Sequence, residues 1–185
     1  MRLFVSTTFD RDFTEGLAAA ADYARANSGQ GAVKWVAPEN FHLTYAFLGD
    51  LGEKAAAAAA EAVKSAAEGQ RAFDITTGAI GMFPSARRPS VIWVGVDQGA
   101  LELRALAARL AEFLAASGIM FENRFEPHIT VGRVKGPLPE GFSRRVTGYS
   151  PSRRGRSRVA SVELTRSELT PEGPVYTRMT SVNLL

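Results

Sequence analysis

The chain has 185 residues, a formal net charge of +3 and 45% hydrophobic residues, which suits one folded domain. It contains no cysteine, so the sequence excludes a disulfide framework, a thiolate nucleophile and a thiolate zinc site. Charged residues follow the N-terminus too closely for a signal peptide, and no apolar run approaches the ~18 residues that a membrane span needs. We therefore expect a soluble, cytoplasmic protein. A monomer is expected as well, although the sequence does not determine the oligomeric state.

Hydrophobic periodicity predicts strands and helices that alternate along the chain. The expected strands cover residues 2–9, 33–36, 41–48, 73–80, 91–96, 127–134, 158–168 and 175–184. The expected helices cover residues 10–27, an alanine-rich stretch that ends before Gly69, and residues 99–117. Residues 136–158 are expected to form a loop, because glycine and proline interrupt the pattern where this segment begins.

A strand–helix–strand unit occurs twice in this pattern. Residues 2–48 contain a strand, a helix, a glycine and a second strand, and residues 91–134 repeat that order. The repeat predicts one α+β domain of two interleaved lobes around a cleft, with closing strands from residues 158–185. Secondary structure alone does not distinguish it from the loose self-similarity of any α+β chain.

The only two histidines of the sequence stand at the start of the second strand of each unit. The motifs are Phe41-His42-Leu43-Thr44-Tyr45-Ala46 and Pro127-His128-Ile129-Thr130-Val131-Gly132. Side chains alternate between the faces of a strand, so each histidine shares a face with the threonine two residues later. Strict alternation adds Ala46 and Gly132 to that face, where their small size would leave a floor for a ligand. The apolar residues between them would face a core.

Two histidines that meet across a cleft can act as an acid–base pair, because imidazole titrates near pH 6.5. The threonine hydroxyls can donate hydrogen bonds to a phosphoryl group that reacts by in-line displacement between them. One such histidine alone is more often half-buried and satisfied on its strand, but position, threonine and small residue recur together here. The sequence has no P-loop and no G-x-S-x-G elbow, and two histidines without a carboxylate cluster make a weak metal site.

With these motifs the chain resembles the two-histidine (2H) phosphoesterases, and among them the RNA 2′,3′-cyclic phosphodiesterases, also called 2′-5′ RNA ligases. The resemblance covers most of the chain, through Arg2-Leu3-Phe4-Val5, Asn40-Phe41-His42-Leu43-Thr44, Phe47-Leu48-Gly49, Phe83-Pro84, Pro89, Val91-Ile92-Trp93, Arg124-Phe125, Pro127-His128-Ile129-Thr130 and Val162-Glu163-Leu164. It implies a bilobal α+β fold, with two antiparallel sheets related by a pseudo-twofold around a central cleft and helices on the outside.

The resemblance also implies hydrolysis of RNA 2′,3′-cyclic phosphate ends to 2′-phosphates without a metal or cofactor, and reversible 2′-5′ RNA ligation by the same site. His42 would protonate the departing 3′ oxygen, His128 would activate water, and Thr44 and Thr130 would bind the phosphoryl oxygens. Which histidine is the acid comes from the family alone. Two alternatives stay open: hydrolysis of a small cyclic phosphate, such as a nucleotide or ADP-ribose derivative, and an RNA-end-binding module without turnover.

Four further residues near the motifs are candidates for binding substrate. Arg124 could approach an anion from the loop before the second motif, and Phe125 could stack on a base. Arg133 would reach the phosphate only if a β-bulge turned it toward His128. Tyr45 stands where the family often has an aliphatic residue, and it could stack on a base or pack in the core.

The basic residues are 18 arginines and four lysines, and six of the arginines gather in the expected loop. These six are Arg144, Arg145, Arg153, Arg154, Arg156 and Arg158. Arginine binds phosphate through a planar fork of donors, so this cluster is the expected guide for an RNA strand through sequence-independent contacts. The alternative is a solvated loop in an arginine-rich protein.

Overall fold

The computed structural model describes residues 1–171 and 173–185. Its helices are α1 (Arg11–Ser28), α2 (Glu53–Ala67), α3 (Ala100–Ala116) and α4 (Phe142–Thr147), with a 3₁₀ turn η1 (Pro38–Asn40). Its strands are β1 (Arg2–Thr7), β2 (Val33–Trp35), β3 (Leu43–Asp50), β4 (Phe73–Phe83), β5 (Val91–Val96), β6 (His128–Val134), β7 (Arg156–Val159), β8 (Ser161–Thr170) and β9 (Gly173–Asn183).

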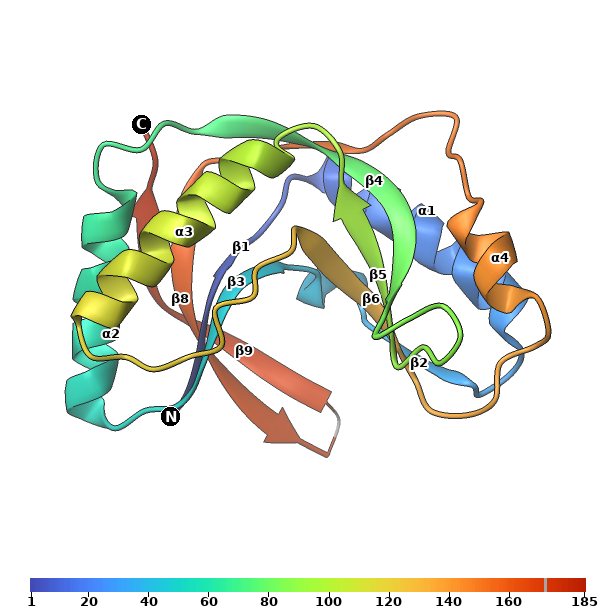
Figure 1. Ribbon diagram of the computed structural model, residues 1–185, viewed down its shortest axis with the longest axis horizontal. Helices are drawn as coiled ribbons and strands as arrows, with labels where there is room; N and C mark the ends of the chain where they lie inside the picture. The colour runs from blue at the N-terminus through green and yellow to red at the C-terminus, as the bar shows by residue number, and fades with distance from the viewer. Residues whose placement is uncertain (172) are drawn as a thin grey trace.

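The strands form two antiparallel sheets with helices on the outside. Sheet A has the order β3-β1-β8-β9, and sheet B has the order β2-β6-β5-β4-β7. Helices α2 and α3 lie together at one end of the molecule, and α1 and α4 lie together at the other (Figure 1). This is the bilobal α+β fold that the sequence predicted.

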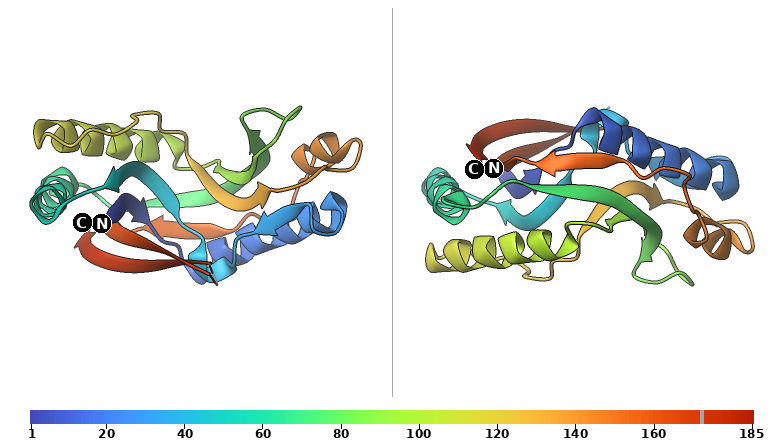
Figure 2. Two further views of the ribbon diagram at one scale, coloured as in Figure 1. Left: turned by 90° about the horizontal axis from the view of Figure 1, so that it is seen from below. Right: turned by 90° about the horizontal axis from the view of Figure 1, so that it is seen from above.

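Helices α1 and α3 each cover the sheet that does not hold the strand before them. Helix α1 follows β1 of sheet A but packs against β4, β6 and β7 of sheet B. Helix α3 follows β5 of sheet B but packs against α2 and against β3 of sheet A. Figure 2 shows α1 and α3 on opposite sides of the molecule with the strands between them. The chain therefore crosses from one sheet to the other in each strand–helix pair.

Small side chains on one face of each helix allow this close packing. In α1 the buried residues include Phe13, Leu17, Ala20 and Ala24, which recur at helical spacing. In α2 the buried residues are alanines apart from Val63, and alanine both favours the helix and lets its backbone approach α3. The helices and the inner faces of both sheets enclose one continuous hydrophobic core.

Two expectations for the C-terminal third are wrong. Residues 136–158 are not a plain loop, because they contain α4 and the first residues of β7. The expected strand at 158–168 is two strands separated at Ala160: β7 pairs with β4 in sheet B, and β8 pairs with β1 in sheet A. Alternation of apolar residues reports which side of a strand faces the core, but it does not report which strand lies beside it. The β8–β9 hairpin then projects from the body of the molecule (Figure 1).

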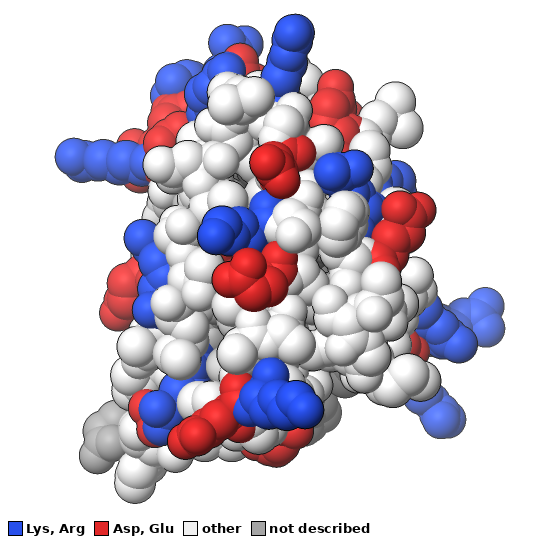
Figure 3. All heavy atoms as spheres, turned by 90° about the vertical axis from the view of Figure 1, so that its left-hand side faces the viewer, with Lys and Arg blue, Asp and Glu red and all other residues white. Residues whose placement is uncertain are grey.

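The outer surface over α2 and α3 carries charges of both signs. Lys and Arg alternate there with Asp and Glu, and neither sign forms an extended patch in Figure 3. This side of the molecule therefore lacks the field of a single sign that attracts a polyanion.

Within the described residues, no helix is both long enough and apolar enough to cross a membrane.

Candidate active site

The two histidine motifs lie where the sheets meet. His42 directly precedes β3 and His128 begins β6, and these two strands lie against each other. The histidines, Thr44 and Thr130 are all partly exposed, whereas the residues between them are buried. The four side chains that the sequence singled out are therefore open to a ligand on one face of each strand.

Each imidazole forms the same type of hydrogen bond, to the backbone carbonyl two residues earlier. Nδ1 of His42 donates to the carbonyl oxygen of Asn40, and Nδ1 of His128 donates to the carbonyl oxygen of Glu126, both at 2.7 Å. A carbonyl oxygen can only accept, so the hydrogen of the neutral ring lies on Nδ1 and Nε2 is left to exchange a proton with a ligand. The sequence did not reveal these contacts, because the accepting atoms belong to the backbone.

Burial lowers the pKa of both histidines below the ordinary value of 6.5, and the carbonyl hydrogen bonds partly oppose that effect. The nearby charges differ. The Arg133 guanidinium further lowers the pKa of His42, whereas the Glu126 carboxylate raises the pKa of His128. The two nearby charges therefore act in opposite directions on the pKa values of the two histidines.

The strand after His42 contains a β-bulge at Tyr45. The residues on either side of Tyr45 pair with consecutive residues of β1, so the alternation reverses beyond it. Ala46 is consequently buried in the core, and Phe47 emerges on the face of the histidine. The ring of Phe4, which lies 5.0 Å from the imidazole of His42, is 6.2 Å from the ring of Phe47.

Strand β6 contains the same bulge, at Val131. Thr130 and Gly132 pair with consecutive residues of β5. Gly132 is consequently buried, and a Cβ there would meet side chains of β2. Arg133 is turned to the site and acts on the pKa of His42.

The two bulges contradict the expected floor of Ala46 and Gly132, and they supply the bulge that Arg133 was expected to need. The expected floor of Ala46 and Gly132 is wrong, because an extra residue in each strand turns both to the core side. Arg133 needed a bulge to reach the site, and that bulge is present. Its guanidinium is close enough to lower the pKa of His42 and to oppose the raised pKa of Tyr176.

The strand register also defines equivalent positions beside the two motifs. Ser6 of β1 and Trp93 of β5 are equivalent, because each pairs with the threonine of a motif. On the other side, Ser6 pairs with Glu163 of β8 and Trp93 pairs with Gly81 of β4. The indole of Trp93 lies across Gly81, where a Cβ would overlap it. The same place in sheet A holds a small serine, and a cavity of about 190 Å³ opens there beside His42.

Two aromatic rings flank each imidazole. The ring pairs and their centroid distances are Phe4 and Tyr176 with His42, both 5.0 Å, and Phe83 and Trp93 with His128, 5.0 and 6.1 Å. Such edge and tilted contacts fix the ring planes and exclude water from around the imidazoles. Tyr176 lies on the last strand of the chain, where nothing in the sequence marked it.

The other candidates near the motifs are less well placed. Tyr45 is buried and its ring stacks on Phe125 at 5.6 Å, so of its two expected roles the structure shows packing in the core and not an exposed ring for a base. Burial raises the pKa of its hydroxyl well above the ordinary value of 10. Phe125 is partly buried and directs its ring to Tyr45. Arg124 is exposed and its guanidinium pairs with the Glu122 carboxylate at 3.5 Å, an interaction that involves neither histidine.

The arginine cluster is largely engaged within the protein. Three of its members form ion pairs: Arg153 with Asp12 at 2.8 Å, Arg154 with Asp97 at 2.7 Å and Arg158 with Asp74 at 3.2 Å. The cluster ends in β7, which β4 and β5 separate from β6. The structure therefore gives these arginines partners in α1, β4 and the turn after β5, and it does not bring β7 beside the histidines.

Two antiparallel sheets that meet at paired His-x-Thr strands are the architecture of a two-histidine phosphoesterase. Family comparison agrees: the family model described as "LigT like Phosphoesterase" matches residues 8–93 and again residues 94–176, and the chain belongs to this family. Each matched segment contains one of the two histidine motifs. Among the described residues, no three His, Asp or Glu side chains gather where they could hold a metal ion.

Relatives support the same assignment, and solved structures have the same fold. The chain is 34% identical to an RNA 2′,3′-cyclic phosphodiesterase of Methanothermobacter thermautotrophicus, over 97% of this chain and 96% of the relative. It is 36% identical to one of Archaeoglobus fulgidus, over 95% and 96% of the two chains. TT0787 of Thermus thermophilus is 28% identical and superimposes with a TM-score of 0.81 over 100% and 98% of the chains. LigT of E. coli, complexed with 3′-AMP, has the same fold, with a TM-score of 0.74 and 24% identity over 99% and 97%.

Proposed function

We propose that the protein hydrolyses RNA 2′,3′-cyclic phosphate ends and leaves a 2′-phosphate. The observation that carries this proposal is the pair of imidazoles on neighbouring strands, each with its hydrogen fixed on Nδ1 and each followed by a threonine. Two relatives that match nearly the whole chain are named RNA 2′,3′-cyclic phosphodiesterase, which supports RNA as the substrate.

In the proposed reaction, water attacks phosphorus on the side opposite the 3′ oxygen. Nε2 of His128 takes a proton from the water, the bond between phosphorus and O3′ breaks, and protonated His42 delivers its proton to O3′. Thr44 and Thr130 donate hydrogen bonds to the non-bridging oxygens. Arg133 balances the charge that develops on them. The imidazoles move the protons and the hydroxyls and guanidinium hold the charge, so the reaction needs no metal.

The charges around the histidines explain how His42 can hold a proton in the complex. In the free protein, the Arg133 guanidinium lowers the pKa of His42. A phosphoryl group bound beside Arg133 would offset that charge and attract a proton to the nearest imidazole. Substrate binding therefore raises the pKa of His42 and prepares it as the acid.

The same groups can join a 2′,3′-cyclic phosphate to the 5′-hydroxyl of another RNA and form a 2′-5′ linkage, because that hydroxyl can take the place of the attacking water. In this reaction His128 takes the proton of the hydroxyl and His42 delivers a proton to O3′, as in hydrolysis, and cleavage of the 2′-5′ linkage exchanges the two roles. Abundant water favours hydrolysis, so ligation is the minor outcome of the proposal. The monomeric state and cytoplasmic location expected from the sequence stay predictions.

The test is hydrolysis of a short RNA with a 2′,3′-cyclic phosphate end, in the presence of EDTA, by wild type, His42→Ala and His128→Ala. We expect wild type to form a 2′-phosphate, and each variant to lose about 10²- to 10⁴-fold in rate, as removal of a general acid or base does. Circular dichroism and melting temperature would show that the variants are folded. Glu53→Gln, at the distant start of α2, is the control for substitution as such.

Each of the other possible outcomes would indicate a different mechanism or function for this protein. Activity that EDTA removes and added metal restores would contradict the metal-free reaction. Turnover of cyclic nucleotides but not of RNA ends would favour a small cyclic phosphate as substrate. Salt-sensitive RNA binding by a folded wild type without turnover would favour the binding module.

A further inference from the structure

The cavity beside His42 exists because equivalent positions in the two sheets hold residues of different size. Beside His128, the large Trp93 lies across Gly81. Beside His42, the equivalent pair is the small Ser6 and the acidic Glu163. Since His42 itself lines the cavity, a group bound there lies next to the reacting phosphoryl group.

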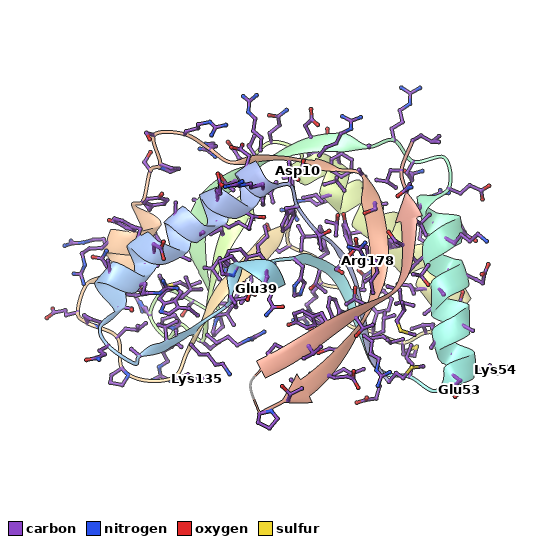
Figure 4. The ribbon with its side chains drawn as sticks, turned by 180° about the vertical axis from the view of Figure 1, so that it is seen from behind. Asp10, Glu39, Glu53, Lys54, Lys135 and Arg178 are labelled. Carbon is purple, nitrogen blue, oxygen red and sulfur yellow. The ribbon has the colours of Figure 1, made fainter. Side chains whose placement is uncertain are left out.

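The cavity combines aromatic and polar walls. Phe4 and Tyr176 line it together with His42, and their rings contact one another edge to face at 5.4 Å. Glu39 of η1 and Arg178 of β9 line it from two further elements, and Figure 4 labels both. Its volume of about 190 Å³ is smaller than the ~300 Å³ at which drug-sized pockets begin, so it suits one ring system and not a whole nucleotide.

Glu163 is a deeply buried charged residue that lines this cavity. Its side chain is only 4% exposed, and Nη2 of Arg178 forms an ion pair with its Oε1 at 2.9 Å. The Thr8 hydroxyl donates to the same oxygen at 3.4 Å. A carboxylate this deeply buried is stable only with such partners, so its position is fixed by the surrounding structure.

The second oxygen of Glu163, Oε2, is left for a ligand. Among the described residues, no group donates a hydrogen bond to it. It is also not one of the fully enclosed polar atoms that lack a partner, which in the described residues are the Tyr45 hydroxyl and the Trp93 Nε1. Oε2 is therefore an accessible hydrogen-bond acceptor in the wall of a cavity flanked by aromatic rings.

We propose that this cavity binds the base of the nucleotide that carries the cyclic phosphate, and that Glu163 selects bases with an exocyclic amine. The inference rests on the proposed function and names the part of the substrate that sheet A recognises. A carboxylate accepts a hydrogen bond from N4 of cytosine. At the same place uracil presents the O4 carbonyl, whose lone pairs face those of the carboxylate. Cytosine is therefore bound and uracil is disfavoured.

The discriminating experiment compares two RNAs that differ only in the terminal base, cytosine or uracil, both with a 2′,3′-cyclic phosphate. We expect wild type to show at least about tenfold higher kcat/KM on the cytosine end, the size of one hydrogen bond to a charged group. In Glu163→Gln the ratio should fall to near one, because an amide can turn its N–H₂ or its oxygen to the base. Glu168→Gln is the matched control, since Glu168 lies on the same strand in an exposed pair with Arg166 and should keep the ratio.

A binding measurement separates this inference from the proposed function. Cytidine 2′-phosphate and uridine 2′-phosphate are titrated into wild type by calorimetry, which needs no turnover and no variant that has to fold. Tighter binding of the cytidine compound by about tenfold supports the cavity as the base site, even if neither RNA is hydrolysed. Equal binding, or equal kcat/KM on the two ends by an active wild type, overturns the inference and leaves the proposed reaction standing.

Discussion

Sheet A and sheet B hold their histidines in the same way but fill the adjacent space differently. In both, Nδ1 donates to the carbonyl two residues earlier and a bulge follows the threonine. Beyond this shared frame, β3 presents Phe47 where β6 presents Arg133, and β1 presents Ser6 where β5 presents Trp93.

The difference separates two tasks that one site must perform. Proton transfer at both ends of an in-line reaction needs similar groups on both sides, and the repeated backbone supplies them. A nucleotide is not symmetric about its phosphorus, so recognition needs a side that differs. The cavity lies on sheet A, and Arg133, the guanidinium that acts on His42, lies on sheet B. Substitutions at equivalent positions can therefore test whether catalysis and recognition are divided in this way.

Among substitutions that leave both histidines in place, the largest effect is expected at the equivalent pair Arg133 and Phe47. Arg133→Ala should lower kcat/KM for a cyclic phosphate end by at least about tenfold, because it removes a charged partner of the phosphoryl group. Phe47→Ala should change it by less than about threefold, since the ring is 66% exposed. Steady-state kinetics measures both, with Arg124→Ala as the control for loss of an exposed arginine near the site. Equal losses of kcat/KM in Arg133→Ala and Phe47→Ala would contradict the division of tasks between the two sheets.

The pH dependence compares the two histidines directly. The active form carries one proton on the pair, so kcat/KM should be bell-shaped, and burial, which lowers the pKa of both, places its centre below pH 6.5. The acid limb falls as both rings become protonated, and the alkaline limb falls as both lose their protons. Because the bound phosphoryl group raises the pKa of His42, the kcat profile should lie at higher pH than that of kcat/KM. A kcat/KM optimum above pH 6.5 would contradict the role of burial.

The smallest effect is expected at the bulges, where Tyr45 of β3 is equivalent to Val131 of β6. The Tyr45 hydroxyl is enclosed without a hydrogen-bond partner among the described residues. Tyr45→Phe removes that hydroxyl and keeps the stack on Phe125, so the free energy of unfolding should rise by about 1 kcal/mol. Urea denaturation measures the change, and Tyr23→Phe, at an exposed ring, is the control. A loss of stability in Tyr45→Phe would mean that the hydroxyl contributes to the fold.

Much of this site could be predicted because it depends on the residue types of the motifs and on the two-residue alternation of side chains along a strand. His42, Thr44, His128 and Thr130 share a face by alternation alone, and the repeat of the motif indicates that two such faces belong together. The family and the two-sheet fold follow from the same residues. The roles of the four side chains stay predictions until they are tested.

The rest depends on strand pairing, which alternation does not encode. A bulge inserts one residue relative to the neighbouring strand, so Ala46 and Gly132 could not be assigned to the core from their own strand. Glu163 stands between Val162 and Leu164, so strict alternation places it on the face opposite to these apolar residues, and its burial could not be predicted from its own strand. Its partner Arg178 lies on β9 and is recognised only when the register of β8 and β9 is known.

The carbonyl bonds of the two imidazoles bear on how this protein tolerates mutation. Because Asn40 and Glu126 contribute backbone oxygens, their side chains are free to change in size and charge while the same ring nitrogen keeps its hydrogen. Pro127 favours an extended conformation for the residue before it, so the carbonyl of residue 126 keeps its direction whatever side chain stands there. The main-chain conformation thus determines the tautomer of each histidine, and substitutions at positions 40 and 126 that keep this conformation keep the tautomer.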